Sequence, residues 1–325
     1  MCKEVYITYF DLLGFKKFID KNDEKHIDTR MGHIFRDIES SLTLNNMKHS
    51  SIDPNIVIPD LAQAKVNCVN ISDTIIYWTK DSSIDSLYNL FLVSFLYNQS
   101  CNLHNFPVRG CLTKGILAHV MGNISSSNNS LYAVQCPYGK GLVKAHEKAE
   151  SQEWAGTVID REVINDLKNS QYSKSFETYC LQYNVPYKNE NTVSQEYAFK
   201  LIEEINNEVH LSNLKHCVKS RFSADNKPVD EPSVKEKIHN TFVFMDYCYE
   251  KQNQKGTIKY PDIRTNLQLN PVFIYTKFWT VSSKIIEQIL DSVAASQLEI
   301  VLQPGGGLLF DYSLTLLATG GFQHR

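Results

Sequence analysis

The spacing of apolar residues divides the first half of the chain into strands and helices. Residues 5–10 are β-branched and aromatic, which predicts a buried strand. Apolar side chains at helical spacing then predict a helix over residues 15–44, interrupted near Asn22 and Asp23. Residues 82–104 are apolar on nearly every face, so this helix should be buried between a sheet and a second surface.

The alternation continues to residue 150. Two strand patterns meet at Asp73 and predict a hairpin, which needs antiparallel neighbours. The order strand-helix-strand-strand-helix-strand predicts an α+β fold of the ferredoxin-like, palm type rather than a doubly wound sheet. The predicted elements are strands over 65–71, 74–78, 107–121 and 131–134, loops over 45–62 and 122–130, and a helix over 139–150.

The second half shows weaker patterns. We expect a first domain over residues 1–165 and a C-terminal extension over 166–302, mixed but mainly helical, to which the sequence assigns no role. Residues 303–325 begin with a Gly-rich stretch and end in an apolar tail of no clear period, for which disorder is one interpretation. Helices are predicted over 195–207, 232–252 and 282–296.

Composition narrows the class of protein. Of the 325 residues, 42% are hydrophobic, enough for a sizeable core, and the net charge of −3 argues against a general nucleic-acid binder. No secretory signal is visible, and the longest apolar run, residues 90–97, is too short to cross a membrane. Eight cysteines without a Cys-x-x-Cys pair indicate reduced thiols. We therefore expect a cytoplasmic protein that binds neither nucleic acid nor membrane.

Two aspartates are the candidate chemistry. Asp11 ends the first strand, and Asp73 lies at the tip of the predicted hairpin. Mg²⁺ is commonly held by one or two carboxylates together with substrate phosphates and water, so the pair suits a nucleotide site. Gly14 permits a tight turn and a close approach of backbone to a ligand. Taken singly, however, either aspartate is typical of a turn or cap residue.

Four short motifs occur in order along the first half. They are Phe-Asp-Leu-Leu-Gly-Phe at residues 10–15, Ser-Asp at 72–73, Arg-Gly-Cys-Leu-Thr-Lys-Gly at 109–115, and Gly-Lys-Gly-Leu-Val-Lys-Ala-His-Glu at 139–147. Together they resemble the catalytic domain of class III nucleotide cyclases. More closely, they are similar to the pyrimidine cyclases of bacterial Pycsar antiphage systems. The resemblance covers residues 4 to 160, which makes 1–165 the expected catalytic domain.

The resemblance implies roles for particular residues. Asp11 and Asp73, with the backbone carbonyl of Leu12, would bind two divalent metal ions, Mn²⁺ or Mg²⁺, for an in-line displacement. Arg109 would stabilise charge at the transferring phosphoryl group, although an arginine whose stem packs at the sheet edge is an equally good interpretation. The residues expected to contact the substrate are Phe10, Leu13, Gly14, Phe15 and Ser72.

The departures from the family pattern bear on the substrate. The positions that read a purine base fall on Val69 and Cys136, and those that position the ribose and stabilise the transition state fall on Val143 and Glu147. The resemblance therefore implies a cyclase acting on UTP or CTP. The product would be a second messenger in bacterial antiviral, abortive-infection defence, read by a cyclic-nucleotide-responsive effector. The alternatives are a catalytically degenerate nucleotide sensor or scaffold, and another palm-fold nucleotidyltransferase.

A homodimer is also expected. Class III cyclases usually assemble each active site from two subunits, and the resemblance implies the same here. The apolar helix over residues 82–104 adds a physical reason, because a face of that size needs cover. The alternative is that residues 170–300 of the same chain cover it.

Overall fold

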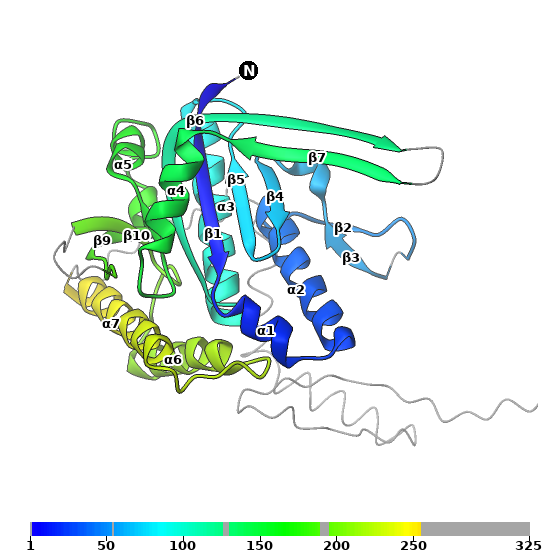
Figure 1. The fold of residues 1–325 in the computed structure, drawn as a ribbon. Coiled ribbons are helices and arrows are strands. Elements are labelled where there is room, and N and C mark those ends of the chain that lie inside the picture. The colour runs from blue at the N-terminus through cyan, green and yellow to red at the C-terminus, as the bar shows by residue number, and fades with distance from the viewer. Residues whose placement is uncertain (1, 54, 126–129, 189–194, 255–325) are drawn as a thin grey trace, which may run out of the picture. The chain divides into compact units, whose positions relative to one another are not determined.

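Strand β1 (Lys3–Leu12) lies in the middle of the sheet that organises the fold (Figure 1). The computed structural model describes residues 2–53, 55–125, 130–188 and 195–254, all within one unit of the chain. The strand order is β4-β5-β1-β6-β8-β10-β9, and within it only the β6–β8 pair is parallel. The other strands are β4 (Asn67–Ile71), β5 (Thr74–Trp78), β6 (Val108–Ser125), β7 (Leu131–Tyr138), β8 (Thr157–Ile159), β9 (Cys180–Asn184) and β10 (Gln195–Phe199).

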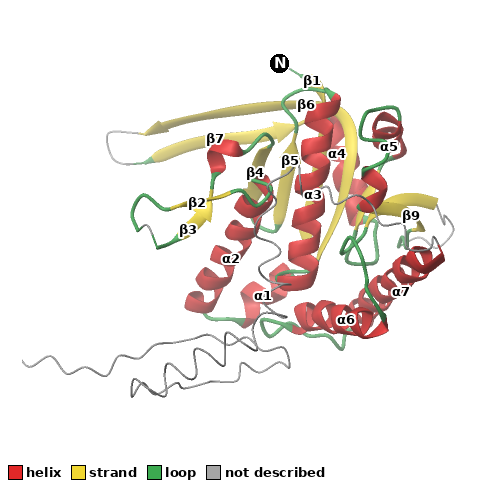
Figure 2. Ribbon diagram, turned by 180° about the vertical axis from the view of Figure 1, so that it is seen from behind, coloured by secondary structure: helices red, strands yellow, loops and turns green. Residues whose placement is uncertain are grey.

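Alternation along β1 sends its side chains to two cores. Tyr6 and Phe10 enter one core, and Ile7 and Tyr9 enter the other. Helix α3 (Ile84–His104) covers the first face and helix α4 (Lys140–Glu150) the second, as the two opposite views show (Figures 1 and 2). Because β5 pairs between β1 and β4, the central strands form a split βαβ arrangement. The expected α+β fold, with a largely antiparallel sheet and a helical C-terminal part, is confirmed.

Helix α3 is covered by its own chain. It packs against α2 (Glu24–Leu42), α5 (Arg161–Lys168) and α6 (Glu208–Ser223) as well as the sheet. Side chains such as Leu90, Phe91 and Phe95 are completely buried there. The argument that this helix requires a second subunit is therefore wrong, and the alternative, cover from within one chain, is what the structure shows.

The second half combines strands and helices. Strand β10 occupies the start of the stretch predicted as a helix over 195–207, so that prediction is wrong, whereas α7 (Pro232–Gln254) confirms the predicted helix over 232–252. Strands β9 and β10 continue the main sheet beyond β8, and the expected boundary after residue 165 falls inside α5. The predicted helix over 282–296 and the 303–325 tail lie outside the described residues.

Smaller elements complete the described part. The break predicted near Asn22 separates α1 (Phe15–Lys21) from α2. The stretch predicted as a loop over 45–62 contains a short hairpin. Strand β6 continues to Ser125, into the loop predicted over 122–130, and pairs with β7 to form a long two-stranded arm (Figure 1). None of the described helices has the length and apolar character that a membrane span requires. The remaining elements are β2 (Met47–His49), β3 (Val57–Pro59), η1 (Leu61–Gln63) and η2 (Phe176–Thr178).

Candidate active site

The two predicted aspartates lie on adjoining segments, where β1 ends beside the β4–β5 hairpin. Ile71 pairs with Thr74, so Ser72 and Asp73 form a two-residue turn, with the left-handed φ of 57° at Ser72. The backbone N–H of Leu12 donates a hydrogen bond of 2.9 Å to the carbonyl oxygen of Asp73. This bond ties the strand end to the hairpin tip. The sequence prediction that these two segments adjoin is thus correct in its geometry.

Arg109 forms a buried ion pair with Asp11. The two residues are directly opposite each other in the β1–β6 ladder, and their side chains are 9% and 14% exposed. Nε and Nη2 of Arg109 both lie 2.8 Å from the same oxygen, Oδ2 of Asp11. The other oxygen, Oδ1, stays outside this ion pair. Arg109 thus fixes the rotation of the carboxylate and leaves one oxygen for a further ligand.

A third carboxylate, Glu150, completes the cluster. It ends helix α4, and its side-chain Oε1 accepts a hydrogen bond from Nη2 of Arg109. Its backbone carbonyl accepts another from Nη1, at 3.0 Å. All three guanidinium nitrogens are therefore engaged. A phosphoryl group could be gripped by two N–H groups of Arg109 only after one of these contacts breaks.

The charges around Asp11 influence its protonation. Burial raises the pKa of the Asp11 carboxyl, and Arg109 opposes that rise. The negative charges of Glu150 and Asp73 raise the pKa further, as expected for carboxylates that share one small region. Burial likewise raises the pKa of Tyr9, whose hydroxyl lies 3.2 Å from Thr74 Oγ1, with Asp11, Glu150 and Asp73 adding to the rise. These groups belong to one electrostatic unit on the α4 face of the sheet.

Close glycine contacts place α4 on this face. A Cβ added to Gly115 of β6 would lie 2.6 Å from the Cα of Gly141, so only glycine permits this approach. The helix then turns His146 toward Tyr9, with 5.1 Å between ring centroids, and Glu150 toward Arg109.

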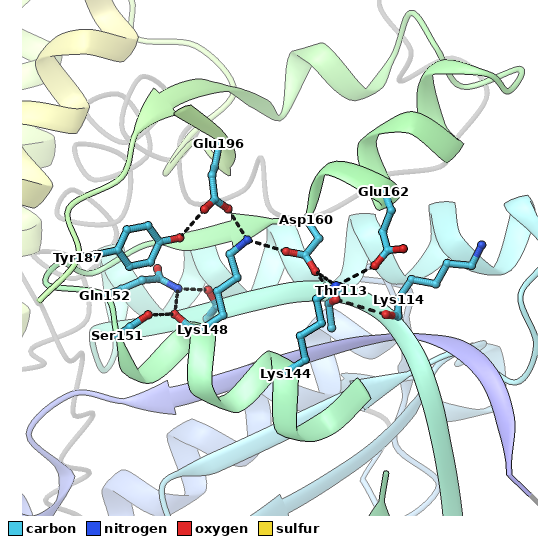
Figure 3. A network of polar contacts seen from close by, with 11 residues as sticks. Thr113, Lys114, Lys144, Lys148, Ser151, Gln152, Asp160, Glu162, Tyr187 and Glu196 are labelled. Atoms are coloured by element: carbon cyan, nitrogen blue, oxygen red, sulfur yellow. Dashed lines mark hydrogen bonds and ion pairs between the residues drawn. The ribbon is translucent and has the colours of Figure 1, made fainter. Parts of the chain in front are cut away.

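Two of the three lysines of α4 form ion pairs outside this cluster. Lys144 and Lys148 both bind Asp160, each at 2.6 Å, and Asp160 also accepts a hydrogen bond from the hydroxyl of Thr113 (Figure 3). Lys148 forms a further ion pair with Glu196 of β10. Because carboxylates of the same chain already hold these ammonium groups, they are not free cations for a substrate phosphate. The network fixes the rotation of α4 instead.

The residues expected to contact substrate differ in what they can offer. The side chains of Phe10, Leu13 and Phe15 are buried in the two cores, so they are not available to a ligand. Gly14 and Ser72 are exposed, and Gly14 adopts a left-handed φ of 81° at the start of α1. Of the positions that depart from the family pattern, Val69 is buried, and Cys136, Val143 and Glu147 are exposed.

The donor set fits a divalent cation bound together with a phosphate. Within the described ranges no group of three or more His, Cys, Asp or Glu side chains is arranged to hold a metal ion. Asp11 Oδ1 and the Asp73 carboxylate, with the carbonyl of Leu12 beside them, supply hard oxygen ligands. Mg²⁺ and Mn²⁺ take the remaining ligands from water and substrate phosphates in sites of this kind.

Three residues of this cluster were not predicted from the sequence. Tyr9 shares the face of Asp11 by strand alternation, so its position could have been inferred. His146 and Glu150 are four residues apart on α4, which places them on one helix face, but the sequence gives no indication of which face meets the sheet.

Comparison with known proteins gives a likeness of fold. No protein-family model and no curated protein matches the sequence. Among solved structures, the chain is similar to the guanylate cyclase domain of RhGC from Catenaria anguillulae in complex with GTP, at 9% identity and a TM-score of 0.41, over 62% of this chain and 98% of that one. It is also similar to the adenylyl cyclase CyaB from P. aeruginosa, at 10% identity and a TM-score of 0.39, over 62% and 95%. The dimeric guanylyl cyclase domain of RhoGC from Blastocladiella emersonii shows 11% identity and a TM-score of 0.40, over 61% and 96%.

Proposed function

We propose that this chain is a cytoplasmic nucleotide cyclase that converts UTP or CTP to the 3′,5′-cyclic nucleotide and pyrophosphate, with divalent Mn²⁺ or Mg²⁺. The observation that carries the proposal is that Asp11, at the end of β1, and Asp73, at the hairpin tip, lie on segments joined by the backbone hydrogen bond from Leu12 to Asp73. The four sequence motifs that resemble class III cyclases supply the choice of reaction. Phosphoryl transfer depends mainly on positioning and on stabilising charge, which such a site can do.

The proposed step is an in-line displacement at the α-phosphorus. The ribose 3′-oxygen forms a bond to phosphorus, its proton passes to solvent, and the bond from phosphorus to the β-phosphate oxygen breaks to release pyrophosphate. The bound cations would supply Lewis acidity. The residues of the chain then have defined tasks. Asp11 and Asp73 would hold the cations, Arg109 orients Asp11, and the triphosphate would bind near Gly14, which is exposed.

The pyrimidine preference rests on what the purine-reading positions lack. Val69 is buried and apolar, so it offers no carboxylate or amine to a guanine or adenine edge. Cys136 is exposed on β7, and a thiol is only a weak hydrogen-bond donor. On the same resemblance, the product would act as a second messenger in bacterial antiviral, abortive-infection defence, through a cyclic-nucleotide-responsive effector.

We also propose that the chain forms a homodimer. The reason is no longer the cover of α3, which comes from the same chain, but the surface of the β6–β7 arm. The β6–β7 arm projects from the sheet (Figure 1). Large apolar side chains are exposed on both of its strands, a feature that commonly marks an interaction surface. They are Val120, Met121, Ile124, Leu131 and Tyr132, each 49–74% exposed.

The direct test is product analysis. The purified chain is incubated separately with ATP, GTP, UTP and CTP, with Mn²⁺ and with Mg²⁺, and the products are resolved by chromatography. We expect a 3′,5′-cyclic pyrimidine nucleotide and an equal amount of pyrophosphate. The substrate assignment would be overturned if the products were cyclic purine nucleotides and no cyclic pyrimidine nucleotide formed.

The alternative is a catalytically degenerate nucleotide sensor. One observation favours it: Arg109 forms an ion pair with Asp11, and this pair competes with a metal ion for the carboxylate. The same experiment distinguishes the two, because a sensor would bind a triphosphate but release no pyrophosphate with any nucleotide or metal.

A further inference from the structure

Arg109 lies between two carboxylates and contacts both from one buried position. Its side chain is 9% exposed, with Asp11 on one side and Glu150 on the other. Taken alone, an Asp11–Arg109 pair is electrically neutral and would attract a cation weakly. With Glu150 and Asp73 included, the cluster carries a formal charge of −2, which attracts divalent cations more strongly.

Glu150 also determines where the guanidinium group points. The backbone carbonyl and Oε1 of Glu150 take hydrogen bonds from Nη1 and Nη2 of Arg109, on the side away from β1. The guanidinium is rigid and planar, so holding that side directs Nε and Nη2 at a single oxygen, Oδ2 of Asp11. Oδ1 is left for the cation.

We propose that Glu150 is a positioning residue that acts through Arg109 to orient Asp11 and to give the site its affinity for a divalent cation. Groups that hold a metal ligand in place commonly change metal affinity by about 10- to 100-fold when removed. The assignment deepens the proposed function, since it rests on the same Asp11–Asp73 site. It gives Arg109 the task of orienting a carboxylate rather than contacting the phosphoryl group.

The test is a titration of the protein with Mn²⁺ alone, without nucleotide. The concentration of free Mn²⁺ is measured at each step by electron paramagnetic resonance. Glu150→Gln keeps the shape and an acceptor oxygen but removes the charge, and we expect its Kd for Mn²⁺ to rise about tenfold or more. Glu236→Gln is the control, because it removes the same charge from an exposed position on another helix, α7. Its Kd should change less than twofold. Unfolding midpoints in EDTA should stay equal for both variants.

A double-mutant cycle tests the route through Arg109. In an Arg109→Gln background, Glu150→Gln should raise the Mn²⁺ Kd by a smaller factor than in the wild-type background, because only the loss of its charge then acts and the group it positions is gone. An equal effect in both backgrounds, or a Glu150→Gln variant indistinguishable from Glu236→Gln, would overturn the inference. Mn²⁺ binding that survives Asp11→Asn unchanged would overturn it too.

Turnover separates this inference from the proposed function. If the wild-type protein is active, the Glu150→Gln variant should need a higher metal concentration for its half-maximal rate. Its nucleotide KM at saturating metal should change little. Normal metal dependence in that variant rejects the role of Glu150 and leaves the cyclase standing. Glu150-dependent Mn²⁺ binding in a protein that turns over none of the four nucleotides rejects the cyclase and leaves the role of Glu150 standing.

Discussion

Lys227 is a buried cation, and replacing it should stabilise the protein. The residue is 7% exposed, and its Nζ has no hydrogen-bond partner in the part of the chain that the structure describes. Its stem lies against Gly14, and Nζ lies 4.3 Å from the ring centroid of Phe106. Burial lowers the pKa of Lys227 from its ordinary value of 10.5 to about 8; Asp225 opposes this shift, and Arg30 and Arg221 add to it.

The magnitude follows from that pKa. A difference of about 2.5 units corresponds to about 3 kcal/mol at pH 7, where the ammonium is charged in both states. The cation–π contact with Phe106 returns up to about 2 kcal/mol of this. Lys227→Met keeps the length of the side chain and removes the charge, and a thioether packs well on an aromatic ring. We expect a gain of about 1–3 kcal/mol in the free energy of unfolding at pH 7.

The pH dependence provides the sharper check. Because the folded pKa lies below the unfolded one, the unfolded state binds more protons between about pH 8 and 10.5, and wild-type stability rises with pH across that window. The advantage of Lys227→Met should therefore shrink, and most of it should be gone by pH 10. Urea unfolding at pH 7 and pH 10 measures this, with Lys219→Met, an exposed lysine of α6, as the control. A variant less stable than wild type at pH 7, or a pH-independent difference, would refute the reasoning.

Three further predictions concern packing, the polar network and the site. Gly115→Ala should destabilise the fold by about 1–3 kcal/mol in urea unfolding, because its Cβ would meet the backbone of α4, whereas Gly122→Ala has open space and should be nearly neutral. Asp160→Asn should cost about 1–3 kcal/mol by removing the carboxylate that Lys144 and Lys148 share, although Lys148 keeps its ion pair with Glu196. Burial raises the pKa of Asp160, but Lys148 and its neighbours lower it more, so acid titration should show this stabilisation above about pH 4 and its loss as pH falls. Arg109→Lys should lower kcat more than it raises the nucleotide KM in steady-state assays, since an ammonium cannot bridge both of its carboxylates.

Local patterns were enough to predict the parts of the site that lie on one continuous segment. The β1 run, the Ser72–Asp73 turn and the break between α1 and α2 follow from apolar spacing and turn residues close in the sequence. The contacts of Arg109 could not be predicted, because they depend on a strand register and a helix rotation set by residues about 100 and 40 positions apart.

The errors of the sequence analysis have the same origin. The sequence pattern of the segment Gln195–Phe199 is compatible with a helix or a strand. The segment forms a strand because it pairs with β8 and β9. The apolar helix α3 was predicted correctly as buried, but its cover comes from helices before and after it in the same chain. A periodicity shows that a face is apolar and does not show what covers it.

The central claim is that Asp11 and Asp73 together carry the turnover. The most direct measurement is the initial rate of pyrophosphate release from UTP and CTP, with Mn²⁺ and with Mg²⁺, for wild type, Asp11→Asn and Asp73→Asn. Asp28→Asn, at an exposed position of α2, is the control for the loss of one carboxylate charge. We predict a loss of about a thousandfold or more for either site variant, with unfolding midpoints near wild type and an unaffected control. Retention of most of the rate in Asp11→Asn or Asp73→Asn, with unchanged metal dependence, would contradict the account.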